Sequence, residues 1–212
     1  LVSADSKTGM ALYGFYRDRE PFDANDDDFS EISLLKNTTI GTRLYHRFST
    51  RNKVIADFFN IKEDRRGGDK FEYPVHETNI AEAVNHNITT GALTYEQYFR
   101  DEDQFSIYLS GQRVNRDSYY GANKSLRDYG NTKDFSYTTG IQYNAKFKNS
   151  NLIFGIENDG AWLKDEKLGY LAIDSVTIIN DSIVDIPHTD NLLVADQMTN
   201  TTGIFAQYEI SL

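Results

Sequence analysis

Oxygen-bearing side chains alternate along one short stretch of the chain. They occupy relative positions 1, 3, 5 and 9, which is the spacing with which the first part of an EF-hand loop surrounds a calcium ion. The four residues are Asp23, Asn25, Asp27 and Glu31. Asp28 stands where such a turn prefers glycine, and Leu34 stands where position 12 would supply a second glutamate. The spacing predicts a calcium ion on these four residues, and the alternative is a hydrated acidic loop.

A second stretch, 115–121, combines an arginine with hydroxyl and aromatic side chains. Arg116, Tyr119 and Tyr120 together suit a ligand that has apolar rings and polar edges. The alternative is local loop packing, with Arg116 paired to the neighbouring Asp117. We therefore take Arg116, Tyr119 and Tyr120 as candidate ligand-binding residues.

Signatures of catalysis and of zinc binding are missing from the sequence. The chain has no cysteine, no Gly-x-Ser-x-Gly motif and no phosphate-binding loop. His76 and His86 are ten residues apart, whereas a helical zinc motif needs histidines four residues apart. The acidic residues at 101–103 fall in a predicted tight turn, where carboxylates are ordinary. We expect neither an enzyme nor a zinc site.

The composition excludes further classes of protein. Lys and Arg total 22 against 32 Asp and Glu, so the net charge is −10, which argues against a nucleic-acid partner. Aromatic residues reach 13%, too many for a disordered chain. No run of about 18 apolar residues predicts a transmembrane helix. The composition does not exclude a membrane-spanning β-barrel, because the strands of such a barrel give a weak hydropathy signal.

The elements that position these residues follow a period of two. Apolar and polar residues alternate most clearly over 135–147, which is the pattern of a strand with one apolar and one polar face. Most predicted strands have ten residues or more, against about five or six in soluble proteins and about 9–11 in membrane barrels. The eight predicted strands are 10–16, 39–48, 54–61, 88–99, 105–114, 135–147, 152–162 and 202–212.

Short and long connections alternate between these strands. Tight turns are predicted at 49–53, 101–103 and 148–150, and a short helix at 78–86. The long connections are predicted at 17–38, 62–87, 115–134 and 163–201. Long loops on one side and tight turns on the other are typical of outer-membrane barrels. The predicted fold class is all-β: an antiparallel up-and-down transmembrane β-barrel, of which residues 1–212 form a segment of about eight strands.

Several loop stretches carry a family resemblance. They are RDREPFDAN (17–25), RRGGDKF (65–71), PVHE (74–77), IAE (80–82), VNRDSYYG (114–121), DYGNT (128–132) and IPHTDN (186–191). Together they resemble the barrel of TonB-dependent outer-membrane receptors, particularly the cobalamin- or siderophore-receptor-like barrels of gut Bacteroidetes. The resemblance covers nearly the whole chain, but it says little about which substrate is bound.

The resemblance implies a 22-stranded barrel, plugged by an N-terminal domain, that imports a scarce ligand such as a corrinoid or a ferric siderophore. The implied partners are the TonB complex, acting through the plug, the lipid bilayer and a surface lipoprotein that caps the loops. Neither the plug nor the TonB-contacting box is recognisable here. We therefore expect a middle segment of the barrel in the bacterial outer membrane, without the plug domain and the remaining strands.

Two other architectures fit parts of the pattern. A complete small eight-stranded outer-membrane barrel would close its first strand on its last. A soluble, secreted β-sandwich that binds carbohydrate would bury the apolar face of every strand and stay monomeric without detergent. These alternatives differ in how the apolar faces are covered.

Overall fold

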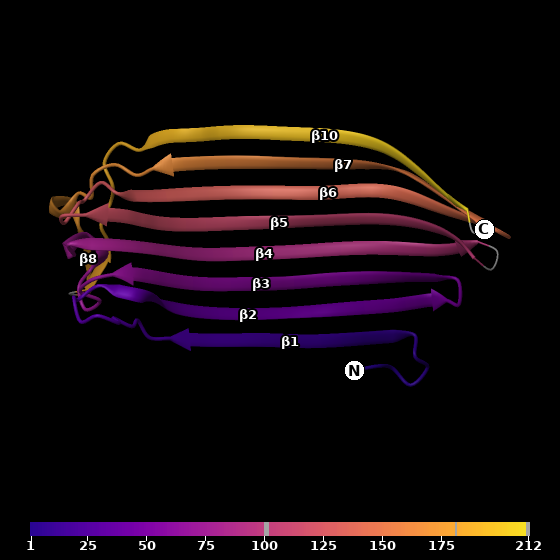
Figure 1. Cartoon of the computed structure of the whole chain (residues 1–212), viewed down its shortest axis with the longest axis horizontal. Helices are drawn as coiled ribbons and strands as arrows, with labels where there is room; N and C mark the ends of the chain where they lie inside the picture. The colour runs from indigo at the N-terminus through magenta and orange to yellow at the C-terminus, as the bar shows by residue number, and fades with distance from the viewer. Residues whose placement is uncertain (100–101, 181, 211–212) are drawn as a thin grey trace.

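Eight long strands pair in chain order into one antiparallel sheet (Figure 1). The computed structural model describes residues 1–99, 102–180 and 182–210. The strands of this sheet are β1 (Thr8–Arg19), β2 (Ser30–Ser49), β3 (Asn52–Gly68), β4 (Ile80–Phe99), β5 (Asp103–Ala122), β6 (Tyr129–Phe147), β7 (Ser150–Lys167) and β10 (Leu192–Ile210). Residues 211 and 212 of the predicted last strand and residue 101 of a predicted turn lie outside the described residues. The antiparallel, up-and-down arrangement predicted from the sequence is confirmed.

Small elements gather at the end of the sheet where the longer connections lie (Figure 1). A separate hairpin is formed by β8 (Thr177–Ile179) and β9 (Ser182–Asp185). Two 3-10 turns, η1 (Val75–Glu77) and η2 (Ile173–Ser175), are the helical elements of the described residues, and neither is long and apolar enough to cross a membrane. We call this end of the sheet the loop end and the opposite end the turn end.

The sheet is a single open layer. In the described part of the chain each long strand packs against its neighbours in the sheet, and no second sheet covers either face. Within the described residues β1 pairs only with β2 and β10 only with β7, so these eight strands do not close on themselves there. The structure therefore matches neither a β-sandwich nor a closed eight-stranded barrel.

The two faces of the sheet differ sharply in chemistry. One face, the apolar face, carries large side chains that are exposed, such as Leu109 at 52% and Ile204 at 86%. Others on this face are Leu12, Ile40, Leu44, Phe58, Leu93, Ile107, Phe135, Ile141, Ile156 and Trp162. The polar face carries half-buried residues such as Ser110, Gln112 and Thr138. A soluble protein has the reverse arrangement, because water favours burial of the apolar side chains.

The strands are longer and the loops shorter than the sequence predicted. The prediction of a long loop at 115–134 was wrong: β5 continues to Ala122 and β6 begins at Tyr129. The other three long connections shrink to 20–29, 69–79 and 168–191. The predicted strands end where apolar residues end, but backbone hydrogen bonds do not depend on side-chain polarity. Polar cross-strand pairs such as Arg116 with Thr132 therefore extend the ladder.

The predicted helix at 78–86 was also wrong. β4 begins at Ile80, and its first residues pair with β3 on one side and β5 on the other. Pairing on both sides satisfies the backbone donors and acceptors that a helix would satisfy internally, so tertiary pairing decides the conformation. The 3-10 turn η1 precedes this strand instead.

Buried apolar residues are confined to the loop end. Among the described residues they are Leu35, Ala81, Val84, Tyr119 and Leu171. All five lie where loops fold back on the strand ends, so this end is the part of the sheet with an interior of its own. The rest of the sheet has no core in the described residues, and none of the described elements packs over its apolar face.

Candidate functional site

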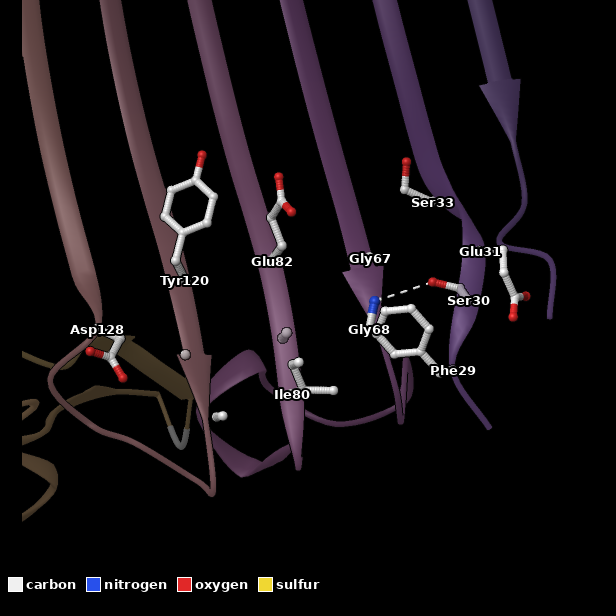
Figure 2. A pocket seen from close by; sticks show the side chains of 13 residues that line it. Phe29, Ser30, Glu31, Ser33, Gly67, Gly68, Ile80, Glu82, Tyr120 and Asp128 are labelled. Carbon is white, nitrogen blue, oxygen red and sulfur yellow. Dashed lines mark hydrogen bonds between the residues drawn. The ribbon is translucent and has the colours of Figure 1, made fainter. Parts of the chain in front are cut away.

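A pocket of about 590 Å³ opens at the loop end of the polar face, between the ends of β2, β3, β4 and β5 (Figure 2). Gly67, Glu82 and Tyr120 stand opposite one another in register on three neighbouring strands. Phe29 and Ile80 add apolar walls. The remaining lining residues are Ser30, Glu31, Ser33, Gly68, Ala81, Gly121, Ala122 and Asp128.

The end of β3 shapes this pocket. Gly68 has a φ of +114°, and a Cβ atom placed on it would lie 2.2 Å from the carbonyl oxygen of Ile80. Only glycine fits a backbone that is both left-handed and this close to its neighbour. The Gly68 N–H donates to Ser30 Oγ at 3.1 Å (Figure 2). Next to it, the buried Asp69 carboxylate accepts N–H groups of Asn79 and Ile80 at 3.0 and 3.1 Å, which fixes the start of β4.

Carboxylates set the charge of the pocket. Among the described residues no lysine or arginine lines the pocket, whereas Glu31, Glu82 and Asp128 do. Asp128 Oδ1 lies 3.5 Å from Lys167 Nζ, but the Glu82 carboxylate has no hydrogen-bond or ion-pair partner among the described residues. The pocket therefore combines apolar and aromatic walls with an unneutralised negative charge.

The structure separates the three predicted ligand-binding residues. Arg116 and Tyr120 lie on the polar face of β5, and Tyr120 lines the pocket. Arg116 is four residues nearer the turn end, about 13 Å along the strand. Its guanidinium donates to Thr132 Oγ1 at 2.8 Å and lies 3.9 Å from Asp165 Oδ1, not beside Asp117. The Arg116 Nε atom is buried without a hydrogen-bond partner among the described residues.

Tyr119 has a different environment, on the opposite face of β5. It is 2% exposed, its hydroxyl donates to the Ser125 carbonyl at 2.8 Å, and its ring meets that of Tyr129 at 4.8 Å. Tyr129 in turn contacts the ring of His188 at 5.0 Å and bonds His76 Nδ1 through its hydroxyl at 2.7 Å. Burial raises the pKa of Tyr129 to about 12. These residues hold three loops against the strands, and Tyr119 does not share a surface with Arg116 and Tyr120.

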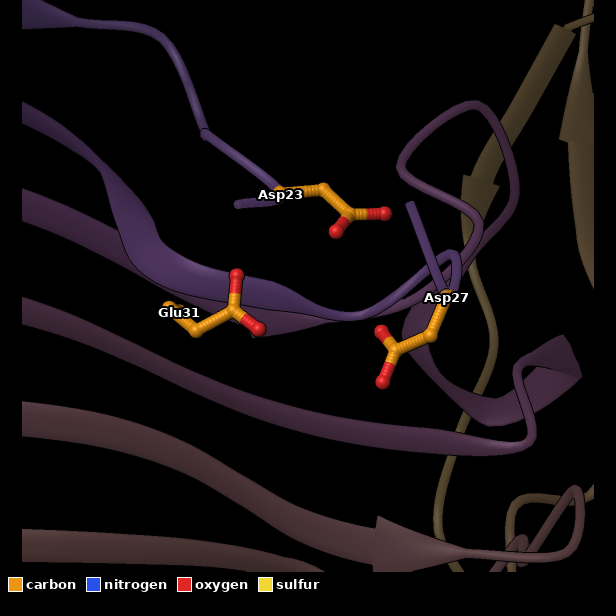
Figure 3. A group of neighbouring side chains, drawn as sticks. All are labelled: Asp23, Asp27 and Glu31. Atoms are coloured by element: carbon orange, nitrogen blue, oxygen red, sulfur yellow. The ribbon is translucent and has the colours of Figure 1, made fainter. Parts of the chain in front are cut away.

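Three of the predicted calcium ligands, Asp23, Asn25 and Asp27, lie in the connection between β1 and β2, and Glu31 lies at the start of β2. Figure 3 shows Asp23, Asp27 and Glu31. Carboxylate oxygens of Asp23, Asp27 and Glu31 come within 4.8 Å of one another. Asn25 lies beside them, and its side-chain amide donates to Asp27 Oδ2 at 3.2 Å. Asp28 has a φ of +68°, so it adopts the left-handed conformation that glycine has at this position of a calcium loop.

Backbone groups already hold this loop. The Asp23 carboxylate accepts N–H groups of Asp26 and Asp28, both at 2.8 Å, and Glu31 Oε2 accepts that of Ala24 at 2.7 Å. Desolvation raises the pKa of Asp23, but the backbone donors outweigh it and bring the pKa below its usual value. The Asp23 carboxylate therefore stays ionised to a lower pH than an ordinary aspartate.

Of the pocket residues, the sequence predicted Tyr120 as a ligand contact and Glu31 as a calcium ligand, and it did not indicate the others. Gly67, Glu82 and Ile80 come from segments predicted as a loop and a helix, and Phe29 comes from a third segment far away in the chain. The one local signal was the Gly67-Gly68 pair, which marks a close approach of backbones inside a strand. The pocket exists only because four strand ends meet.

Comparisons with known proteins agree with this architecture. No family model matches the sequence, and no curated protein matches it. Among solved structures, the fold is similar to the closed form of the ferric-catecholate import receptor Fiu from E. coli K12, with a TM-score of 0.53 and 10% identity. The similarity covers 86% of this chain but 31% of that receptor, so the chain spans about a third of its length. At this identity the likeness concerns the fold: an antiparallel, up-and-down sheet similar to part of an outer-membrane receptor barrel.

Proposed function

We propose that this chain forms part of the wall of a TonB-dependent outer-membrane receptor that imports a scarce nutrient. The observation that carries the proposal is the exposed apolar face on a single-layer sheet. Exposure of so much apolar surface to water costs about 25 cal/mol for each Å², whereas the hydrocarbon of a bilayer accepts it. The proposed activity is transport and not catalysis.

In this proposal the apolar face lies against lipid, the loop end faces the outside of the cell and the turn end faces the periplasm. Residues 1–212 are one segment of the barrel domain in this proposal, and the TonB complex contacts a plug domain. The resemblance of the loop stretches favours a receptor of the Bacteroidetes type, with a surface lipoprotein as a further partner over the loops.

The pocket is the proposed contact for the imported ligand. Tyr120 offers a ring face, Glu82 an unpaired carboxylate, and Arg116 a further polar contact deeper along the strand. Tyr119 supports this site from behind, through the loop cluster with Tyr129. Because carboxylates and no lysine or arginine line the pocket in the described part of the chain, its charge favours a neutral or cationic ligand such as a corrinoid over an anionic ferric siderophore.

Fractionation of cells that produce the full chain tests this proposal. We expect the protein in the outer-membrane fraction, released by detergent and not by salt, with a β-rich circular dichroism spectrum in detergent. In such membranes we expect cyanocobalamin to bind more tightly than a ferric catecholate. A monomer that folds in buffer without detergent would contradict the membrane location. Tighter binding of the catecholate would contradict only the choice of ligand.

A second proposal concerns the loop between β1 and β2: we propose that Asp23, Asn25, Asp27 and Glu31 hold a calcium ion. Three carboxylates within 4.8 Å repel one another, and a divalent cation would offset this repulsion. Glu31 also lines the pocket. Calcium there would reduce the negative charge at one wall of the ligand site.

Calcium should raise the unfolding temperature of the full chain, and EDTA should lower it. At a hundredfold excess over the dissociation constant the expected stabilisation is about 2.7 kcal/mol. The Asp23→Asn variant should lose this response, because it removes a charged ligand. Asp26→Asn, with the same change of charge in the same loop, should keep it. Equal unfolding temperatures of the unsubstituted chain in calcium and in EDTA would contradict the site.

A further inference from the structure

Three basic side chains lie together on the apolar face, near the loop end. They are Arg113 on β5, Lys133 on β6 and Lys164 on β7. Arg113 stands in register with Phe135, which stands in register with Trp162, and the two aromatic rings stack at 5.6 Å. Together these five side chains line a hollow of about 370 Å³.

Two of the three charges in this hollow lack a counterion among the described residues. All three basic side chains are exposed, and Arg113 and Lys133 have no ion-pair or hydrogen-bond partner among the described residues. Lys164 Nζ lies 2.9 Å from Glu166 Oε1. Lys133 and Lys164 stand directly opposite each other, and like charges in this position destabilise a strand pair. An anion between the two lysines would remove that repulsion.

Three other polar residues line the hollow. Asp196 on β10 stands in register with Lys164 and is, among the described residues, the one acidic side chain of the lining on the same face. Asp134 also belongs to the lining, but its position in the strand places it on the polar face. Asn115 Oδ1 is buried here without a hydrogen-bond partner among the described residues. The chain has a net charge of −10, so this basic group opposes the overall balance.

The apolar surface continues from the hollow toward the turn end. Leu109, Ile141, Ile156 and Ile204 are exposed along it. Phe105, Tyr143 and Phe154 join Ile141, Ile156 and Ile204 around a further hollow of about 490 Å³. A ligand that fits both the basic hollow and the apolar surface beside it needs an anionic headgroup and a hydrocarbon portion.

We propose that Arg113, Lys133 and Lys164 bind the phosphate group of an anionic lipid whose acyl chains lie along the apolar face. Basic side chains at a membrane interface attract anionic headgroups, and their aliphatic stems extend along apolar surface. Trp162 and Phe135 fit the interfacial level, where aromatic rings are enriched. The proposal rests on the proposed membrane location of the apolar face.

Trp162 provides the readout, because it lines the hollow and is the one tryptophan of the sequence. The full chain in neutral detergent is titrated with phosphatidic acid or phosphatidylcholine that carry identical brominated acyl chains, which quench tryptophan fluorescence on contact. Subtracting the signal of a Trp162→Phe variant isolates this residue. We expect half-maximal quenching at a phosphatidic acid concentration at least about tenfold lower than that of phosphatidylcholine, given about fivefold for each basic residue.

Both lipids should quench the tryptophan fluorescence of a triple variant equally. This variant carries Arg113→Gln, Lys133→Gln and Lys164→Gln. A control with Lys146→Gln and Lys148→Gln, near the turn end, should keep the preference. Equal quenching of the unsubstituted chain by both lipids would overturn the headgroup site and leave the proposed function intact. Quenching by neither lipid would overturn both the headgroup site and the proposed function, because the apolar face would then not contact lipid.

Discussion

Leu109→Arg is expected to destabilise the full chain in a lipid bilayer by about 2–4 kcal/mol, the cost of an arginine near the middle of the lipid-facing surface of a barrel. Leu109 is 52% exposed on the apolar face of β5, so the arginine would meet no protein clash. The penalty would come from moving a charge into hydrocarbon. Equilibrium unfolding in denaturant, after reconstitution into phosphatidylcholine vesicles, measures it.

The neighbouring position supplies the control. Ser110 follows Leu109 on the same strand and lies on the polar face. Ser110→Arg introduces the same side chain at nearly the same depth, yet it should change the free energy of unfolding by less than about 1 kcal/mol. If both variants lost the same stability, the assignment of the two faces, and with it the proposed function, would be wrong.

Gly68→Ala should cost about 3 kcal/mol or more. A backbone with φ near +114°, as at Gly68, costs about 1–3 kcal/mol for a residue with a Cβ atom. Here the Cβ would also lie 2.2 Å from the Ile80 carbonyl oxygen, which is backbone and cannot move aside without displacing β4. We expect a lower midpoint of denaturant unfolding and weaker ligand binding, because the pocket wall would shift.

Gly67→Ala is the matched control for this prediction. Its Cβ would meet its nearest neighbour, Ser33 Cβ, at 3.6 Å, an ordinary contact, and its backbone is not left-handed. It should therefore leave the free energy of unfolding within about 0.5 kcal/mol of the unsubstituted value. Similar losses in the two variants would show that the end of β3 adapts and that Gly68 is not needed for the pocket.

Much of the fold could be predicted from the sequence, because strand periodicity is local. The alternation over 135–147 indicated both the strand and its two faces, and the structure confirms them. The ends of the strands were harder to predict from the sequence. Polar cross-strand pairs, such as that of Arg116 with Thr132, extend β5 and β6 past the last apolar residue. The residues around these pairs show no alternation of apolar and polar residues, so the sequence did not indicate that the strands continue there.

The candidate site shows the same division. The spacing of Asp23, Asp27 and Glu31 is local, and the structure brings their carboxylates together. The pocket is not local: Gly67 and Tyr120 come from the ends of β3 and β5, Phe29 comes from the connection before β2, and the pairing of the strands brings them together. Tyr119 and Tyr120 are neighbours in sequence, but the pleat sends them to opposite faces.

By itself, the sequence determined that this chain is all-β, that its strands are long, and that one side of the most regular strands is apolar. These properties follow from a side-chain period of two, which any strand imposes on its own residues. Only the tertiary structure decided where the strands end, which residues form the pocket and which basic side chains share a hollow. Backbone pairing fixes the register across neighbouring strands, and register brings together residues that are far apart in the chain.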